Sequence, residues 1–198
     1  MVLDLLLPAS CRSLSLPAKA IVAPPEVAGA LLAVEEGWVL VTVRSGLEGR
    51  RSVVALAGAG AVLPCPGEGE LLETLSAARV TVLSEEGLRE LLAEPAAAEV
   101  LADALLAAVR DRQESLRSLG HVRHAERVRG KLLQLARDHG RVAARGIRLD
   151  LPLTHELLAD MIGSSRETVT IALAELQREG FVSRTGRFYR LDVAPDEL

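Results

Sequence analysis

Two hydrophobic patterns divide the chain near residue 84. Before it, short apolar runs at 38–43, 52–56 and 80–83 are separated by Gly and Pro turn signals. Short strands at this spacing are typical of an antiparallel barrel or sandwich. After residue 84 a short helix is predicted over 88–92, and then a long one, because apolar residues recur at steps of three, four and seven. The pattern therefore predicts an α+β protein with an N-terminal antiparallel β domain.

A single apolar stripe follows the long helix predicted over 95–120. Pro95 stands at its start, where the first helical turn tolerates proline. The members of the stripe are Leu101, Leu105, Ala108, Val109, Leu116 and Leu119. A helix this long is unusual in a small domain, so the stripe predicts a coiled coil with a second copy of the chain. Packing of the helix on its own β domain is the alternative.

The last third of the chain carries the pattern of two short helices joined by a tight turn. Thr154 can cap the first helix, and Gly163 ends it. Ser164 and Glu167 have the spacing of a capping box for the second helix. Its predicted buried positions are Val169, Ala172, Leu173 and Leu176. Two helices joined through a glycine turn form a helix-turn-helix.

A hairpin is predicted after Gly180, with strands over 181–184 and 187–191 around Thr185 and Gly186. Next to a helix-turn-helix such a hairpin is a wing. It contains every Phe and Tyr of the chain, and we expect these rings to pack the wing onto the helices. The arginines that flank the turn are Arg184, Arg187 and Arg190. Each could be a solvated charge or a phosphate contact.

The distribution of charge supports a nucleic-acid partner for the last third. The whole chain of 198 residues has a formal net charge of −4. Residues 121–190, however, contain 13 Lys and Arg against eight Asp and Glu, whereas residues 1–120 contain 10 against 16. An acidic front and a basic back indicate a phosphate-facing surface near the C-terminus.

The remaining composition narrows the function classes. Cys11 and Cys65 form no CxxC pair and are too few for a four-thiolate metal site, so they are interpreted as unpaired thiols and no metal or cofactor is expected. No apolar run reaches the ~18–20 residues of a membrane span, and the N-terminus has no basic signal-peptide region, so a cytoplasmic protein is expected. The chain shows no HExxH, phosphate-loop or Ser/His/Asp pattern, which argues against an enzyme.

The second helix of the helix-turn-helix leaves one face free for DNA. Its buried stripe directs Glu167, Thr170, Ile171 and Arg178 away from the core, with Arg166 at the flank. In a major groove, Arg pairs with guanine, Glu accepts from cytosine N4 and an apolar group meets the thymine methyl. Ile171 either makes such a thymine contact or packs against the wing. Glu167 either reads a base or completes the capping box.

The segment 163–169, Gly-Ser-Ser-Arg-Glu-Thr-Val, resembles the start of the recognition helix in the cyclic AMP receptor protein and fumarate–nitrate regulator family. The resemblance covers the whole plan and is most specific in the last third. It implies a cyclic-nucleotide-binding-like β-roll domain over 1–94, a dimerisation helix over 95–120 and a winged helix-turn-helix over 121–198. It also implies a homodimer on a pseudo-palindromic double-stranded DNA site, with RNA polymerase as a further partner.

The resemblance also implies residue roles. Arg166 and Glu167 would read a G and a C of a GTGA-like half-site, and Thr154 and Thr168 match phosphate-contacting positions. His155 stands where the family often has Arg or another polar residue. With these we group Arg178, Arg184 and Arg187 as phosphate contacts, and Thr170 and Ile171 as base contacts. The family usually has a second base-reading Arg at the position of Ile171, so the half-site should deviate there.

The N-terminal domain departs from the cyclic-nucleotide binders of that family. Their phosphate cassette contains Gly-Glu followed by Arg-Ser or Arg-Ala. In the corresponding stretch 64–78 only Gly67-Glu68 matches, no Arg follows, and Glu68, Glu70 and Glu73 would repel a phosphate. Arg112 and Gln113 align with the small hydroxyl pair that meets the nucleotide base.

These departures predict a regulator that does not depend on cyclic AMP. All four histidines lie beyond the β domain, which argues against a haem ligand in it. The alternative is a regulator gated by an unidentified small molecule in the β-roll.

Overall fold

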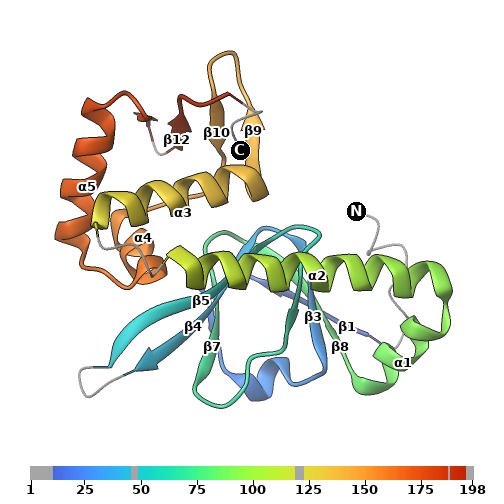
Figure 1. Ribbon diagram of the computed structural model, residues 1–198. Coiled ribbons are helices and arrows are strands. Elements are labelled where there is room, and N and C mark those ends of the chain that lie inside the picture. The colour runs from blue at the N-terminus through green and yellow to red at the C-terminus, as the bar shows by residue number, and fades with distance from the viewer. Residues whose placement is uncertain (1–10, 46–48, 119–122, 187, 195–198) are drawn as a thin grey trace. The chain divides into compact units, whose positions relative to one another are not determined.

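The computed structural model describes residues 11–45, 49–118, 123–186 and 188–194. These form two compact units, 1–110 and 111–198, and each is described by itself. The first is built from antiparallel strands followed by helices, and the second from three helices and a small sheet (Figure 1). The predicted α+β class, with a β-roll before a winged helix-turn-helix, is confirmed.

The N-terminal unit contains two four-stranded antiparallel sheets. The first has the order β1 (Arg12–Leu16), β8 (Ala78–Leu83), β3 (Leu31–Glu36) and β6 (Val62–Pro64). The second has the order β2 (Ile21–Val22), β7 (Glu70–Thr74), β4 (Trp38–Ser45) and β5 (Arg50–Gly58). A short 3₁₀ helix, Pro24–Val27, follows β2. Gly37 joins β3 to β4 with φ of 81°, which a side chain rarely adopts.

Small aliphatic side chains fill the space between the two sheets. The cluster includes Leu32, Val34 and Val80 from the first sheet and Val39 and Leu72 from the second, all almost fully buried. Alternating residues of each strand supply them, as the period of two requires. This unit therefore builds its core from Val, Leu and Ala.

Two helices follow β8. Ser84 caps α1 (Glu85–Ala93) by accepting a hydrogen bond from the N–H of Gly87, so the helix begins three residues before the predicted 88–92. Helix α2 spans Pro95–Ser118. Its first turns pack on the outside of the first sheet, where Ala97 and Leu101 are buried in one cluster with Ala33 and Leu83.

The C-terminal unit begins with α3 (His124–His139), which is followed by β9 (Gly140–Val142) and β10 (Ile147–Leu149). Helices α4 (His155–Ile162) and α5 (Arg166–Arg178) come next, and β11 (Val182–Thr185) and β12 (Phe188–Leu191) end the fold. The sheet has the order β11-β12-β10-β9. Its core includes Leu132, Leu158, Ile162 and Val169, each with no exposed surface.

Candidate nucleic-acid interface

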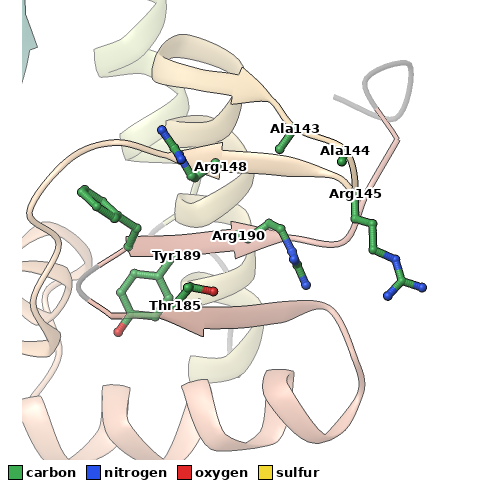
Figure 2. Close-up of a pocket in the computed structure, with 8 residues that line it drawn as sticks. Ala143, Ala144, Arg145, Arg148, Thr185, Tyr189 and Arg190 are labelled. Atoms are coloured by element: carbon green, nitrogen blue, oxygen red, sulfur yellow. The ribbon is translucent and has the colours of Figure 1, made fainter.

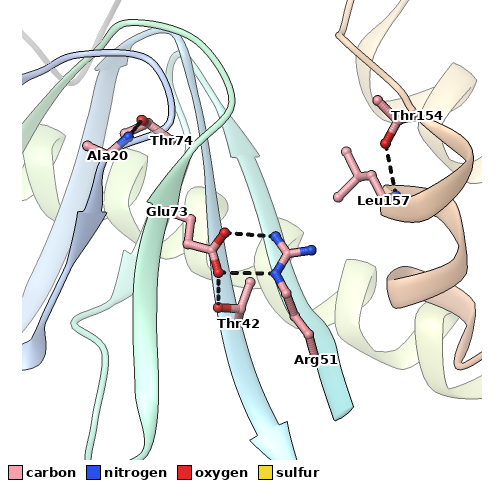
Figure 3. Close-up of polar contacts among 7 residues, drawn as sticks. All are labelled: Ala20, Thr42, Arg51, Glu73, Thr74, Thr154 and Leu157. Carbon is pink, nitrogen blue, oxygen red and sulfur yellow. Dashed lines mark hydrogen bonds and ion pairs between the residues drawn. The ribbon is translucent and has the colours of Figure 1, made fainter. Parts of the chain in front are cut away.

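The turn between α4 and α5 sets the geometry of the site. Thr154 caps α4 as predicted, with its hydroxyl accepting from the N–H of Leu157 at 3.0 Å (Figure 3). Gly163 ends the helix in the left-handed region, at φ of 64° and ψ of 39°. That conformation is cheap only for glycine. The two helices therefore meet through a turn of three residues, 163–165.

The cap of α5 differs from the sequence expectation. Ser165 is the cap and accepts from the N–H of Thr168 at 3.1 Å. Ser164, the predicted cap, is 8% exposed and forms a hydrogen bond with Nδ1 of His124 at 3.2 Å. The capping box was therefore wrong by one residue, because tertiary packing draws Ser164 inward. Glu167 becomes the second helical residue rather than the third, so it has no capping role and stays exposed.

The free face of α5 carries the predicted base contacts. The predicted buried stripe of Val169, Ala172, Leu173 and Leu176 is confirmed, each being at most 3% exposed. On the other side Arg166, Glu167 and Thr170 are exposed, and Ile171 is 69% exposed. The wing does not cover Ile171, which excludes the packing alternative in this chain. A large exposed aliphatic side chain beside Arg and Glu suits base-edge contact in a major groove.

An open hollow of about 340 Å³ lies beside this face. It is lined by Thr154, His155, Glu156, Arg166 and Arg184. His155 Nδ1 lies 2.8 Å from the hydroxyl of Thr170, which also donates to the carbonyl of Arg166. Burial lowers the pKa of His155, and the charges of Arg184 and Arg166 lower it further. The hollow thus joins the N-termini of both helices to the wing.

Of the other predicted phosphate contacts, only Arg184 lines this hollow among the described residues. Thr168 is half-buried, its hydroxyl 2.9 Å from that of Ser165, and Arg178 is exposed at the last turn of α5. Arg184 on β11 is exposed and donates to the carbonyl of Gly186 at 3.1 Å. Arg187 lies outside the described residues.

The wing aromatics divide between the two faces of the small sheet. Phe181 and Tyr189 are buried, as expected for rings that pack the wing on the helices. Phe188 instead lines a hollow with Arg148 and Arg190. This arginine-rich face was not predicted from the sequence. Its signal was the alternation of Arg148 and Arg190 with buried neighbours along β10 and β12.

In the N-terminal unit, the stretch aligned with the phosphate cassette is a short loop whose polar groups hydrogen-bond to each other. Five residues, 65–69, connect β6 to β7. The Gly67 N–H donates to the carboxylate of Glu70 at 2.8 Å, and the Glu70 N–H donates to the Gly67 carbonyl at 3.1 Å. The backbone donor of Gly67 therefore already has an anionic partner from its own chain.

Glu73 is also satisfied within its sheet (Figure 3). Its carboxylate accepts from Thr42 at 2.6 Å and forms an ion pair with Arg51 at 2.8 Å. Burial alone would raise the pKa of Glu73, but the hydrogen bonds from Arg51 and Thr42 and the charges of Arg51 and Arg44 hold it below its usual value. Glu73 is thus a structural carboxylate bound to Arg51.

The predicted dimer stripe falls on two different faces of α2. Leu101 is 2% exposed and lies in its own chain's core, and Leu105 packs against the same cluster. This differs from the sequence expectation, because the start of α2 packs on the first sheet. Ala108 is half-buried, whereas Val109 is 51% exposed and Leu106, absent from the predicted stripe, is 52% exposed. The side chain of Leu116 and all of Leu119 lie outside the described part of the chain.

The described residues contain no helix with the length and hydropathy of a bilayer span. They also contain no group of three His, Cys, Asp or Glu side chains placed to hold a metal ion. Cys65 is half-buried, and burial raises the pKa of its thiol to about 11.

Known proteins share both the sequence of the helix-turn-helix and the fold. Residues 126–194 match the Crp-like helix-turn-helix domain. The chain is 41% identical over 70 residues to the global nitrogen regulator of Synechocystis sp., covering 35% of this chain and 31% of the relative. It is 31% identical over 115 residues to the CRP-like cAMP-activated global transcriptional regulator of Mycobacterium tuberculosis, covering 58% of this chain and 51% of the relative. The matches thus span about half or less of these curated relatives.

The fold extends the likeness to the whole chain. The crystal structure of a CRP/FNR family transcriptional regulator from Thermus thermophilus superposes with a TM-score of 0.67 at 22% identity, covering 94% of this chain and 95% of the other. At this identity the likeness shows the fold alone. Residues 126–194 therefore form a Crp-like helix-turn-helix domain, and the chain as described has the fold of the CRP/FNR regulator structure.

Proposed function

We propose that the protein is a sequence-specific transcription regulator that inserts α5 into the DNA major groove. The observation that carries this proposal is the free face of α5, where Arg166, Glu167, Thr170 and Ile171 are exposed side by side above a fully buried stripe. Arg166 and Glu167 would read a G and a C, and Ile171 a thymine methyl. Thr154, His155, Thr168, Arg178, Arg184 and Arg187 would hold the phosphates that fix the register.

A homodimer would place two such helices on one duplex. Positions 102, 106, 109 and 113 of α2 are all exposed and are spaced four, three and four residues apart, which is the a/d spacing of a coiled coil. Leu106 and Val109 are the large apolar members of this dimer seam, and Gln113 is a polar member that would fix the pairing register. A two-fold dimer implies a pseudo-palindrome with half-site centres about 34–36 Å apart.

The dimer seam can be tested separately. Leu106→Glu with Val109→Glu should convert a dimer to a monomer in light scattering, because charges would face each other across the seam. Leu92→Glu is the matched control, since Leu92 is also 52% exposed but lies on α1. A dimer that survives the double substitution would exclude this seam.

We further propose that DNA binding does not require cyclic AMP. In the short connection 65–69 the Gly67 N–H donates a hydrogen bond to Glu70, and Arg51 forms an ion pair with Glu73. Both carboxylates would repel an incoming phosphate. Isothermal titration of the purified protein with cyclic AMP should therefore give no heat of binding at concentrations that saturate a cyclic AMP-dependent control protein. Binding with an increase in DNA affinity would reject this part.

The central experiment is selection of bound duplexes from random DNA, with and without a cellular metabolite extract. We expect a pseudo-palindromic motif without extract. Failure to enrich any motif under either condition would reject sequence-specific binding. Enrichment that needs the extract would favour a regulator gated by a small molecule. Whether transcription rises or falls, and whether RNA polymerase is contacted, can then be tested on the selected sequence.

A further inference from the structure

Three arginines stand side by side across the wing sheet. Arg141 on β9 is opposite Arg148 on β10, and Arg148 is opposite Arg190 on β12. Side chains of directly opposite residues share one face of a sheet. We call Arg141, Arg148 and Arg190 the arginine row.

The row lies on the face of the sheet that is turned away from the helices. The neighbours of Arg148 and Arg190 along their strands are at most 2% exposed and form part of the core: Ile147, Leu149, Tyr189 and Leu191. The side chains of Arg141, Arg148 and Arg190 are instead 77%, 53% and 34% exposed. The alternation of the strands therefore puts the row on the outside of the unit.

A shallow hollow of about 310 Å³ extends from the row to the wing (Figure 2). Arg145, in the connection between β9 and β10, lies at one end of it, and Thr185 of the wing at the other. Phe188 forms an apolar wall, and the guanidinium of Arg148 lies 5.7 Å from the centre of its ring. This stacking restrains Arg148 and leaves the edge of its guanidinium available for hydrogen bonds.

Two carboxylates face the row and do not neutralise it. Asp150 accepts from Arg148 at 2.9 Å and lies 3.5 Å from Arg141, and Asp192 lies 3.3 Å from Arg190. The hydrogen bond from Arg148, opposed by partial burial, holds the pKa of Asp150 below its usual value. Arg145 has no ion-pair partner among the described residues. Four guanidinium groups thus face two carboxylates, and the outer face keeps a net positive charge.

This face is continuous with the proposed DNA surface through the wing. Successive residues of β11 point to opposite sides, so Arg184 lines the hollow beside α4 and α5 while Thr185 lines the outer hollow. The end of β11 at Arg184 and Thr185 therefore stands between two basic surfaces. A ligand that follows both must be long, anionic and regularly charged, which describes the phosphate backbone of duplex DNA.

We propose that the arginine row and Arg145 bind backbone phosphates of duplex DNA flanking the half-site that α5 reads. The proposal rests on the proposed DNA-binding function and extends its footprint beyond the wing. These contacts carry no base specificity, so they raise affinity for any flanking sequence and steepen the dependence on salt.

The test compares two duplexes that carry the same selected core. One ends at the outer edges of the half-sites, and the other is extended by about one helical turn, roughly 10 bp, on each side. The full-length protein should bind the extended duplex more tightly. A variant with Arg141→Gln, Arg145→Gln and Arg148→Gln should lose this gain while its affinity for the core duplex stays the same. Its slope of log affinity against log salt on the extended duplex should fall by about 0.9 for each lost contact.

Two further variants control for folding and for charge. Arg145→Gln alone breaks no ion pair among the described residues and should remove part of the gain, whereas Arg145→Lys should restore it. Arg89→Gln removes an exposed charge from α1 and should leave the gain intact.

The two proposals fail in different ways. This inference alone would be overturned if the wild-type protein bound the core duplex and the extended duplex equally tightly. It would also be overturned if the triple variant kept the full increase in affinity for the extended duplex. Absence of any specific core binding would instead overturn the proposed function. If the gain persisted in the variants but the core complex lost contact with a protein partner, the row would be a protein-docking surface and the phosphate assignment would be wrong.

Discussion

The two units of this protein differ in what their polar side chains contact. In the N-terminal unit, the carboxylates of Glu70 and Glu73 are bound by their own chain, to Gly67 in one case and to Thr42 and Arg51 in the other. In the C-terminal unit, Arg166, Glu167 and Ile171 project from a well-packed helix and are exposed. Both units keep the fold of the CRP/FNR regulator structure, whereas the described polar groups are paired within the first unit and exposed on α5 of the second. A shared fold therefore does not imply a shared ligand site.

We expect the largest change in stability from core substitutions, which test whether the two units unfold separately. Leu158→Ala should destabilise the C-terminal unit by about 2–5 kcal/mol, because it opens a cavity at a side chain with no exposed surface. Leu40→Ala is the matched substitution in the N-terminal unit, where Leu40 is equally buried. Calorimetry should show each variant shifting a different transition. If both variants moved a single shared transition, the units would be one cooperative body.

The next effect concerns base reading. Arg166→Ala should cost about 1–3 kcal/mol in binding to the selected site and relax the preference for guanine at one position. Binding to random duplexes should change much less, so the ratio of specific to random affinity is the quantity to measure. Arg178→Ala is the control, since a phosphate contact should weaken both affinities alike. An unchanged ratio for Arg166→Ala would remove this arginine from the base readers.

A matched pair of helix caps separates stability from function. Ser84 accepts from Gly87 at 3.0 Å at the start of α1, and Ser165 accepts from Thr168 at 3.1 Å at the start of α5. Replacing either serine by Ala should cost about 1 kcal/mol of stability in its own unit. Only Ser165→Ala should also weaken DNA binding, because α5 carries the proposed base contacts. Equal loss of DNA affinity in both variants would contradict this assignment of function.

The smallest effect is a pH dependence confined to the C-terminal unit. Burial and the charges of Arg184 and Arg166 lower the pKa of His155, which favours its neutral form in the free protein. A bound phosphate would favour the protonated form and raise that pKa, so binding would take up a proton. Affinity should therefore rise as the pH falls from the raised pKa of the complex towards the pKa of the free protein, and level off below it. His155→Gln should flatten the dependence of DNA affinity on pH in fluorescence titrations. If the affinity of this variant depended on pH as steeply as that of the wild type, His155 would be excluded as the source.

Local patterns were enough to predict most strands and helices and the cap of α4. Alternation of small aliphatic residues encodes the strands, and Thr154 and Gly163 encode the ends of α4, because capping and the left-handed turn depend on a few neighbouring residues. The buried stripe of α5 followed from the helical period, and with it the identity of the exposed residues.

The tertiary fold sets which residues share a surface. It moved the cap of α5 to Ser165 by packing Ser164 beside His124, and it took Leu101 into the chain's own core. It also brought Arg141, Arg148 and Arg190 into one row. Strand register and helix rotation are set by contacts between segments distant in sequence. A local hydrophobic period carries no information about such contacts.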